Sequence, residues 1–89
     1  MATMFIRHTV SDFAKWKAAY DRAGPMQDAA GVTAEAVYQL ADDPNDVTVM
    51  HDFATLEAAK AFVSGIDLKQ AMEEAGVVGT PTICFTTKV

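Results

Sequence analysis

Two histidines and two aromatic residues are the side chains of this sequence best suited to chemistry. His8 lies in "TMFIRHTV" and His51 in "VTVMHDF", while Trp16 and Tyr20 follow in "RHTVSDFAKWKAAYD". Histidine exchanges protons near neutral pH, so either one could deprotonate an activated carbon acid or a phenolic substrate that is then rearranged, cyclised or passed to oxygen. Trp16 and Tyr20 are four residues apart, which places both on one helix face as a wall for a ligand. We therefore take His8 and His51 as candidate catalytic residues and Trp16 and Tyr20 as candidate ligand-binding residues.

A simpler interpretation of these residues stays open. A histidine on a strand is often a hydrogen-bonded structural residue, and aromatic residues at helical spacing are often core. His8, His51 and Asp52 could suggest an iron site, but Asp52 directly follows His51 and should point to the opposite face of a strand. The acidic segment "DDPND" lacks the spacing of a calcium loop, and its residue types are typical of a turn. The sequence therefore predicts no metal and no cofactor, with haem on a histidine as a lesser alternative.

Composition limits the class of protein. A chain of 89 residues is expected to form one small domain over 1–89, and the net charge of -5 disfavours nucleic-acid binding. There is no run of about 18 apolar residues and no signal-peptide pattern, so we expect no membrane span and a cytoplasmic location. The lone Cys84 is expected to be a buried apolar residue. The 51% hydrophobic content favours burial of some surface against a partner chain.

Local patterns predict four strands and three helices. β-branched and aromatic residues mark the strands, and capping residues and glycines mark the helix ends. The glycines in "AGVVGTP" (75–81) do not have the spacing of a dinucleotide site. We expect them to turn the chain from helix into strand. The expected order is a strand over 3–10, a helix from a cap at Ser11 or Asp12 to Gly24, a loop to Gly31, strands over 33–40 and 47–53 joined by a hairpin connection over 41–46, a helix from Thr55 to Gly65, a short helix from Asp67 to Gly76, and a strand over 81–87.

This β-α-β-β-α-β order predicts an α+β, ferredoxin-like fold with a four-stranded antiparallel sheet and helices on one face. The first and third strands should be central neighbours, so His8 and His51 could line one cavity between sheet and helices. The opposite face also carries large apolar residues, including Phe5 and Met50. A sheet that is apolar on both faces needs two covers, which predicts a homodimer whose sheets pack face to face.

Three segments resemble the small stand-alone proteins of the dimeric α+β barrel superfamily, which includes the antibiotic biosynthesis monooxygenase-like domains. They are "RHTVSDFAKWKAAYD", "YQLADDPNDVTVMHDF" and "DLKQAMEEAGVVGTP". The resemblance implies the same fold and dimer, with a pocket whose mouth lies near "AGVVGTP". It does not select a reaction, because the superfamily includes cofactor-independent oxygenases, haem-degrading enzymes, isomerases and polyketide cyclases. Quinone-forming oxygenases of this kind use an asparagine with a tryptophan and a basic residue, whereas the only asparagine here is Asn45, in the predicted hairpin.

The leading hypothesis is a small homodimeric protein that binds a modest apolar or aromatic molecule between sheet and helices. It could act as a cofactor-independent monooxygenase, cyclase or isomerase. The alternative is a non-catalytic ligand-binding or interaction module, in which the same four residues only pack. A perturbed, cleft-facing histidine would favour the enzyme, whereas an apolar cavity alone would suffice for the module.

Overall fold

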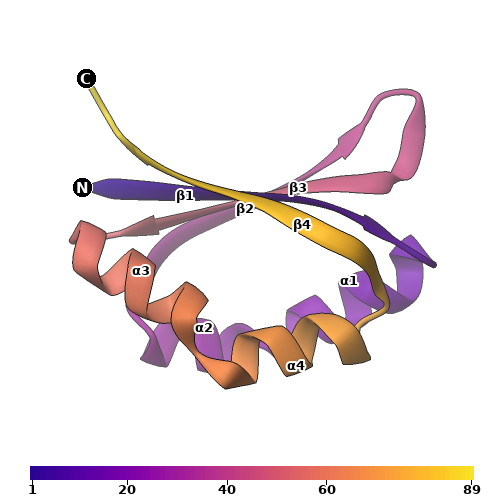
Figure 1. Ribbon diagram of the computed structural model, residues 1–89, viewed down its shortest axis with the longest axis horizontal. Coiled ribbons are helices and arrows are strands. Elements are labelled where there is room, and N and C mark those ends of the chain that lie inside the picture. The colour runs from indigo at the N-terminus through magenta and orange to yellow at the C-terminus, as the bar shows by residue number, and fades with distance from the viewer.

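The computed structural model describes the backbone of all 89 residues and every side chain except those of residues 66 and 67. One antiparallel sheet with the strand order β2-β3-β1-β4 carries all four strands, and the four helices lie on one of its faces (Figure 1). The predicted ferredoxin-like sheet is therefore confirmed. The elements are β1 (Ala2–Val10), α1 (Phe13–Arg22), α2 (Gly24–Ala29), β2 (Val32–Leu40), β3 (Asp43–Phe53), α3 (Leu56–Ser64), α4 (Ile66–Glu74) and β4 (Val77–Thr87).

Strand β1 shows why the sheet has a helix-covered and an open face. Met4, Ile6 and His8 are buried on the covered face, while Arg7 and Thr9 are exposed on the other. Side chains of a strand alternate between faces, so the apolar parity of the sequence fixes which face the helices cover. β1 and β3 are central neighbours, as predicted, and this brings both histidines to the covered face.

Two side-chain caps position the helices. The carboxylate of Asp12 accepts from the backbone N–H of Lys15 at the start of α1, and the hydroxyl of Thr55 accepts from that of Ala58 at the start of α3. Both satisfy amides that an isolated helix end leaves without partners. The prediction of a loop after Gly24 is wrong, because α2 begins there. Pro25 ends α1 yet fits the first turn of α2, where its missing N–H costs nothing.

Two predicted strands were too short. The turn between β2 and β3 is confined to residues 41–42, and β3 already begins at Asp43. Pro44 is tolerated because its part of β3 lies beyond the pairing with β1, which extends to Asp46.

β4 begins at Val77, and its pairing with β1 shifts register opposite Gly79, whose φ is 74°. A bulge at this left-handed glycine lets the strand continue through the segment expected to be a turn.

The short helix was predicted to start at Asp67, whose side chain is outside those described. The helix there, α4, begins at Ile66 with Gly65 in the cap position. In the described part of the chain no helix has the length and apolar character needed to cross a membrane.

The open face of the sheet carries one apolar row. Ala36, Met50, Phe5 and Cys84 are successive cross-strand neighbours from β2 to β4. The two flanking rows are more polar, with Tyr38, Thr48, Arg7 and Thr82 in one and Ala34, Asp52, Thr3 and Thr86 in the other. Arg7 binds the Asp46 carboxylate through two hydrogen bonds. The prediction that Cys84 is buried is wrong, because its parity places it on the face that no helix covers.

Candidate functional site

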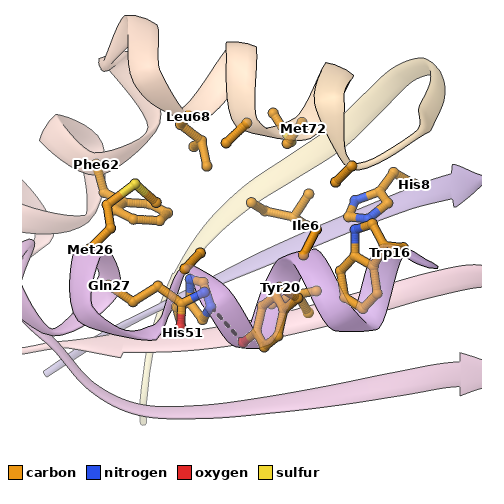
Figure 2. Close-up of a pocket in the computed structure, with 15 residues that line it drawn as sticks. Ile6, His8, Trp16, Tyr20, Met26, Gln27, His51, Phe62, Leu68 and Met72 are labelled. Atoms are coloured by element: carbon orange, nitrogen blue, oxygen red, sulfur yellow. Dashed lines mark hydrogen bonds between the residues drawn. The ribbon is translucent and has the colours of Figure 1, made fainter. Parts of the chain in front are cut away.

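A cavity of about 70 Å³ lies between the sheet and the helices, where the two clusters of core residues meet (Figure 2). All four candidate residues line it, so the structure brings the predicted set together. Its lining side chains are apolar except for the polar groups of the two histidines, Trp16, Tyr20 and Gln27. The lining residues are Ile6, His8, Trp16, Ala19, Tyr20, Ala23, Met26, Gln27, Val49, His51, Phe62, Leu68, Ala71, Met72 and Ala75.

His8 projects from β1 at one end of the cavity. Its side chain is buried, and neither Nδ1 nor Nε2 has a hydrogen-bond partner among the described residues. The ring packs against the Trp16 indole with 5.5 Å between ring centroids. Burial lowers the pKa of His8, and the negative charge of Asp46 opposes this only in part. His8 is therefore neutral near pH 7, with one nitrogen able to donate and the other able to accept a hydrogen bond.

His51 projects from β3 at the other end and is 3% exposed. Its Nε2 lies 3.0 Å from the Tyr20 hydroxyl oxygen, while its Nδ1 has no partner among the described residues. The edge of its ring meets Phe62 at 5.4 Å between centroids. Burial lowers the pKa of His51, opposed by the charge of Glu35. This imidazole is also neutral near pH 7.

The Tyr20 hydroxyl connects His51 to the protein surface. It donates to Oε2 of Glu35 over 2.6 Å, and Glu35 is exposed. Burial, and then the hydrogen bond to Glu35, raise the pKa of Tyr20 well above its usual value, so the phenol keeps its proton. Sequence reasoning missed Glu35. The signal was strand register, because Glu35 is the direct cross-strand partner of His51.

Gln27 is a second residue that sequence reasoning missed. It is buried, 6% exposed, and lines the cavity from α2. Buried glutamine is uncommon, and its amide offers the cavity both donors and an acceptor. No pattern in the sequence pointed to Gln27, because its segment was expected to be a loop.

Aromatic rings form a continuous wall from His8 to His51. Trp16 stacks on Tyr20 with 5.0 Å between centroids and 24° between planes, and Tyr20 stacks on His51 with 6.0 Å and 25°. Both pairs have the offset separations that aromatic rings prefer. This wall suits contact with another flat, apolar ring. The packing role and the ligand-facing role expected for Trp16 and Tyr20 therefore coexist in the geometry.

Small residues line part of the helix side of the cavity. Ala19 of α1 and Ala71 of α4, with Ala23 and Ala75 directly after these helices, line it and are partly exposed. Its volume is about half of the roughly 150 Å³ of a cavity that holds benzene, so a ring-sized ligand requires some outward movement of the wall. Methionines adapt easily to such changes, and Met26 and Met72 lie on the helix side.

The two histidines cannot ligate one metal ion. His51 pairs with Met4, and His8 lies four residues further along β1, which is a separation of about 13 Å along the strands. Asp52 is turned to the other face, where it accepts a hydrogen bond from Thr3. Among the residues whose side chains are described, no group of three or more potential ligands could hold a metal.

Asn45 does not reach the cavity. Its side-chain oxygen accepts from the backbone N–H of Phe13 and so ties β3 to the start of α1. The only asparagine of the sequence therefore has a structural contact, and the asparagine-based site of quinone-forming oxygenases has no counterpart here.

Comparison with solved structures identifies the fold. The chain superposes on a proposed antibiotic biosynthesis monooxygenase from Bordetella bronchiseptica with a TM-score of 0.84 and 18% identity, covering 99% of this chain and 96% of that one. For SnoaB, a cofactor-independent oxygenase from Streptomyces nogalater, the TM-score is 0.79 at 14% identity, covering 99% and 92%. For NE2512, a protein of unknown function from Nitrosomonas europaea, it is 0.75 at 20% identity, covering 96% and 85%. No family model and no curated protein matches the sequence.

Proposed function

We propose that this chain, which has the fold of antibiotic biosynthesis monooxygenase-like proteins, binds a small aromatic molecule in the cavity and exchanges a proton with it through a histidine. One observation carries the proposal. Three buried imidazole nitrogens, two on His8 and one on His51, have no partner among the described residues, in an otherwise apolar cavity.

The chemistry of these nitrogens indicates the kind of ligand. A buried polar atom without a partner costs about 1–3 kcal/mol, and a ligand that supplies the partner recovers part of this. An imidazole lone pair accepts from an O–H group, and the aromatic wall contacts an apolar ring. A phenol or a related carbon acid satisfies both requirements. A ligand that carries a fixed charge would instead pay to enter an apolar cavity.

The most concrete reaction is cofactor-independent monooxygenation. A neutral histidine removes a proton from an activated CH₂ group that is conjugated to a phenol. The resulting anion gives electrons to O₂, one oxygen atom becomes the new carbonyl, and the other leaves as water with the two hydrogens. The fold is shared with SnoaB, which is a cofactor-independent oxygenase. Cyclisation and isomerisation would use the same deprotonation, and a binding module would omit it.

Ligand binding tests the proposal directly. Phenol and toluene have nearly the same shape, and only phenol can donate to a histidine. We expect phenol to shift the amide NMR signals of cavity residues at lower concentration than toluene does, and we expect this preference to disappear in the double variant His8→Ala, His51→Ala. Tyr38→Phe is a matched control, since Tyr38 is 56% exposed and lies outside the cavity. Unchanged phenol preference in the double variant would sink the proposal.

Catalysis needs a separate assay, because a binding module would pass the first one. Oxygen consumption is followed with phenols whose keto tautomers carry an acidic CH₂ group. An enzyme of this type consumes one O₂ per carbonyl formed, and the His8→Ala and His51→Ala variants identify the base by the larger loss. Binding without oxygen consumption would favour the non-catalytic alternative or a reaction that does not use oxygen.

The homodimer is part of the same proposal. The apolar row of Ala36, Met50, Phe5 and Cys84 lies on the face of the sheet that no helix covers. A second copy packed there by its own row would bury it and leave both cavities on the outer sides. Native mass spectrometry reports the number of subunits and the mass of any retained molecule in one spectrum. A monomer at micromolar concentration would show that the row is simply exposed surface.

A further inference from the structure

We infer that Tyr20 and Glu35 form a proton relay that sets the tautomer of the His51 ring and connects it to solvent. The use of this relay in a reaction rests on the proposed function, whereas the tautomer does not. The observation behind it is that one phenol oxygen contacts both a buried imidazole, as Figure 2 shows, and the exposed Glu35 carboxylate.

The direction of the hydrogen bonds follows from counting protons. The Tyr20 hydroxyl has a single proton, and a carboxylate can only accept. Tyr20 therefore donates to Glu35, at 2.6 Å, and its oxygen must accept from His51 Nε2, at 3.0 Å. A neutral imidazole carries one N–H, so the proton of His51 is on Nε2. Its Nδ1 then holds a free lone pair and has no donor among the described residues.

The three groups lead from the core to the surface in two steps. His51 is 3% exposed and lies on central strand β3, whereas Glu35 is exposed on edge strand β2. Because Glu35 and His51 are cross-strand partners, the sheet register holds both ends of the relay in place. The nearby charges of Lys17 and Asp21 pair with each other on α1, beside the Tyr20 ring.

This arrangement can export a proton taken from a ligand. Nδ1 of His51 forms a bond to the ligand's proton while its Nε2–H bond breaks. That second proton goes to the Tyr20 oxygen as the original phenol proton passes to Glu35, which releases it to water. One proton thus moves from ligand to solvent, and no electron pair leaves the ligand. The ring is left with its proton on Nδ1. The starting tautomer returns when Nδ1 gives this proton to the product while Glu35 takes one from water, which passes through Tyr20 to Nε2. Tyr20 and Glu35 act here as positioning residues for His51.

The tautomer is measured on the free protein, so the result does not depend on a ligand. Long-range ¹H–¹⁵N correlation spectra of the ¹⁵N-labelled chain at pH 8 distinguish a proton on Nε2 from one on Nδ1. We expect His51 of the wild type to carry it on Nε2. Glu35→Ala frees the Tyr20 hydroxyl to donate to His51, which should change the ratio of the two tautomers by about tenfold or more. Tyr20→Phe removes the acceptor and should also produce a mixture.

Two controls make the outcome decisive. Glu73→Ala removes an exposed glutamate that lies outside the cavity and should leave the His51 signals unchanged. Glu35 is itself exposed, so its variant should keep the fold, and the amide spectrum verifies this. A wild type protonated on Nδ1, or a Glu35→Ala variant with the wild-type ratio, overturns the relay. The phenol assay is independent, so a failure of binding with the expected tautomer would refute only the proposed function.

Discussion

Removing one oxygen atom from the core should have a measurable cost in stability. In Tyr20→Phe the ring remains to stack on Trp16 and His51, and only the hydroxyl is lost. Its partner Glu35 is exposed and can turn to water, whereas His51 is 3% exposed and keeps an N–H without an acceptor. A buried donor left without a partner costs about 1–3 kcal/mol, so we expect the free energy of unfolding to fall by that amount.

Urea denaturation followed by circular dichroism at pH 7.5 measures this change. All variants are compared at one protein concentration, because subunit association would make stability depend on it. Glu73→Ala is the control, since Glu73 is exposed on helix α4, away from the proposed dimer face, and should change the free energy by less than about 0.5 kcal/mol. The reasoning also predicts coupling. When His51 is already replaced by phenylalanine, Tyr20→Phe leaves no buried N–H without an acceptor and should cost at least about 0.5 kcal/mol less. A Tyr20→Phe variant as stable as Glu73→Ala, or an equal loss with and without His51, would refute the argument.

Two further predictions concern a glycine and the pH dependence of stability. Gly76 has a φ of 88°, and a Cβ there would lie 2.7 Å from Ser11 Oγ, whereas Gly31 has a φ of 96° and open space around it. Gly76→Ala should therefore lower the melting temperature more than Gly31→Ala, and Ser11→Ala should remove part of the difference; equal shifts would contradict the steric argument. Burial lowers the pKa of His8 and His51, so the unfolded chain binds more protons than the folded chain between the lowered values and about 6.5. Stability should be full above about pH 6.5 and decrease as the pH falls, and urea midpoints should decrease less in the double variant His8→Phe, His51→Phe.

The sequence predicted the fold through features that act locally. Parity along β1 assigned His8 and Ile6 to the covered face, and the caps at Asp12 and Thr55 marked helix starts that the structure confirms. The late start predicted for β4 was wrong because of an interaction between distant segments. Gly79 extends β4 by forming a bulge against β1, which only the paired sheet reveals.

Four residues of the candidate site were predicted, but the hydrogen bonds that connect them to Glu35 were not. His8, Trp16, Tyr20 and His51 share one cavity because helix and strand periodicities each assign a face. Glu35 was not identified as a site residue, because its role depends on the register between β2 and β3, and register is set by packing over the whole sheet. The roles of these residues, the dimer, the cytoplasmic location and the choice between enzyme and binding module stay predictions.

The pairing of β1 with β4 affects how this chain must fold during synthesis. Ala2 lies opposite Thr87, so one of the two pairings of central strand β1 joins an early and a late segment of the described chain. While the ribosome still holds the C-terminal segment, β1 can pair with β3, but its other edge has free N–H and C=O groups. Such an edge can pair with another nascent chain, and closing so long a loop is slow. Charged side chains on a strand edge discourage pairing with another chain. β1 has few of them, because Arg7 is its only lysine, arginine or acidic residue. The interval before β4 arrives is therefore when this protein is most exposed to aggregation or to chaperone binding.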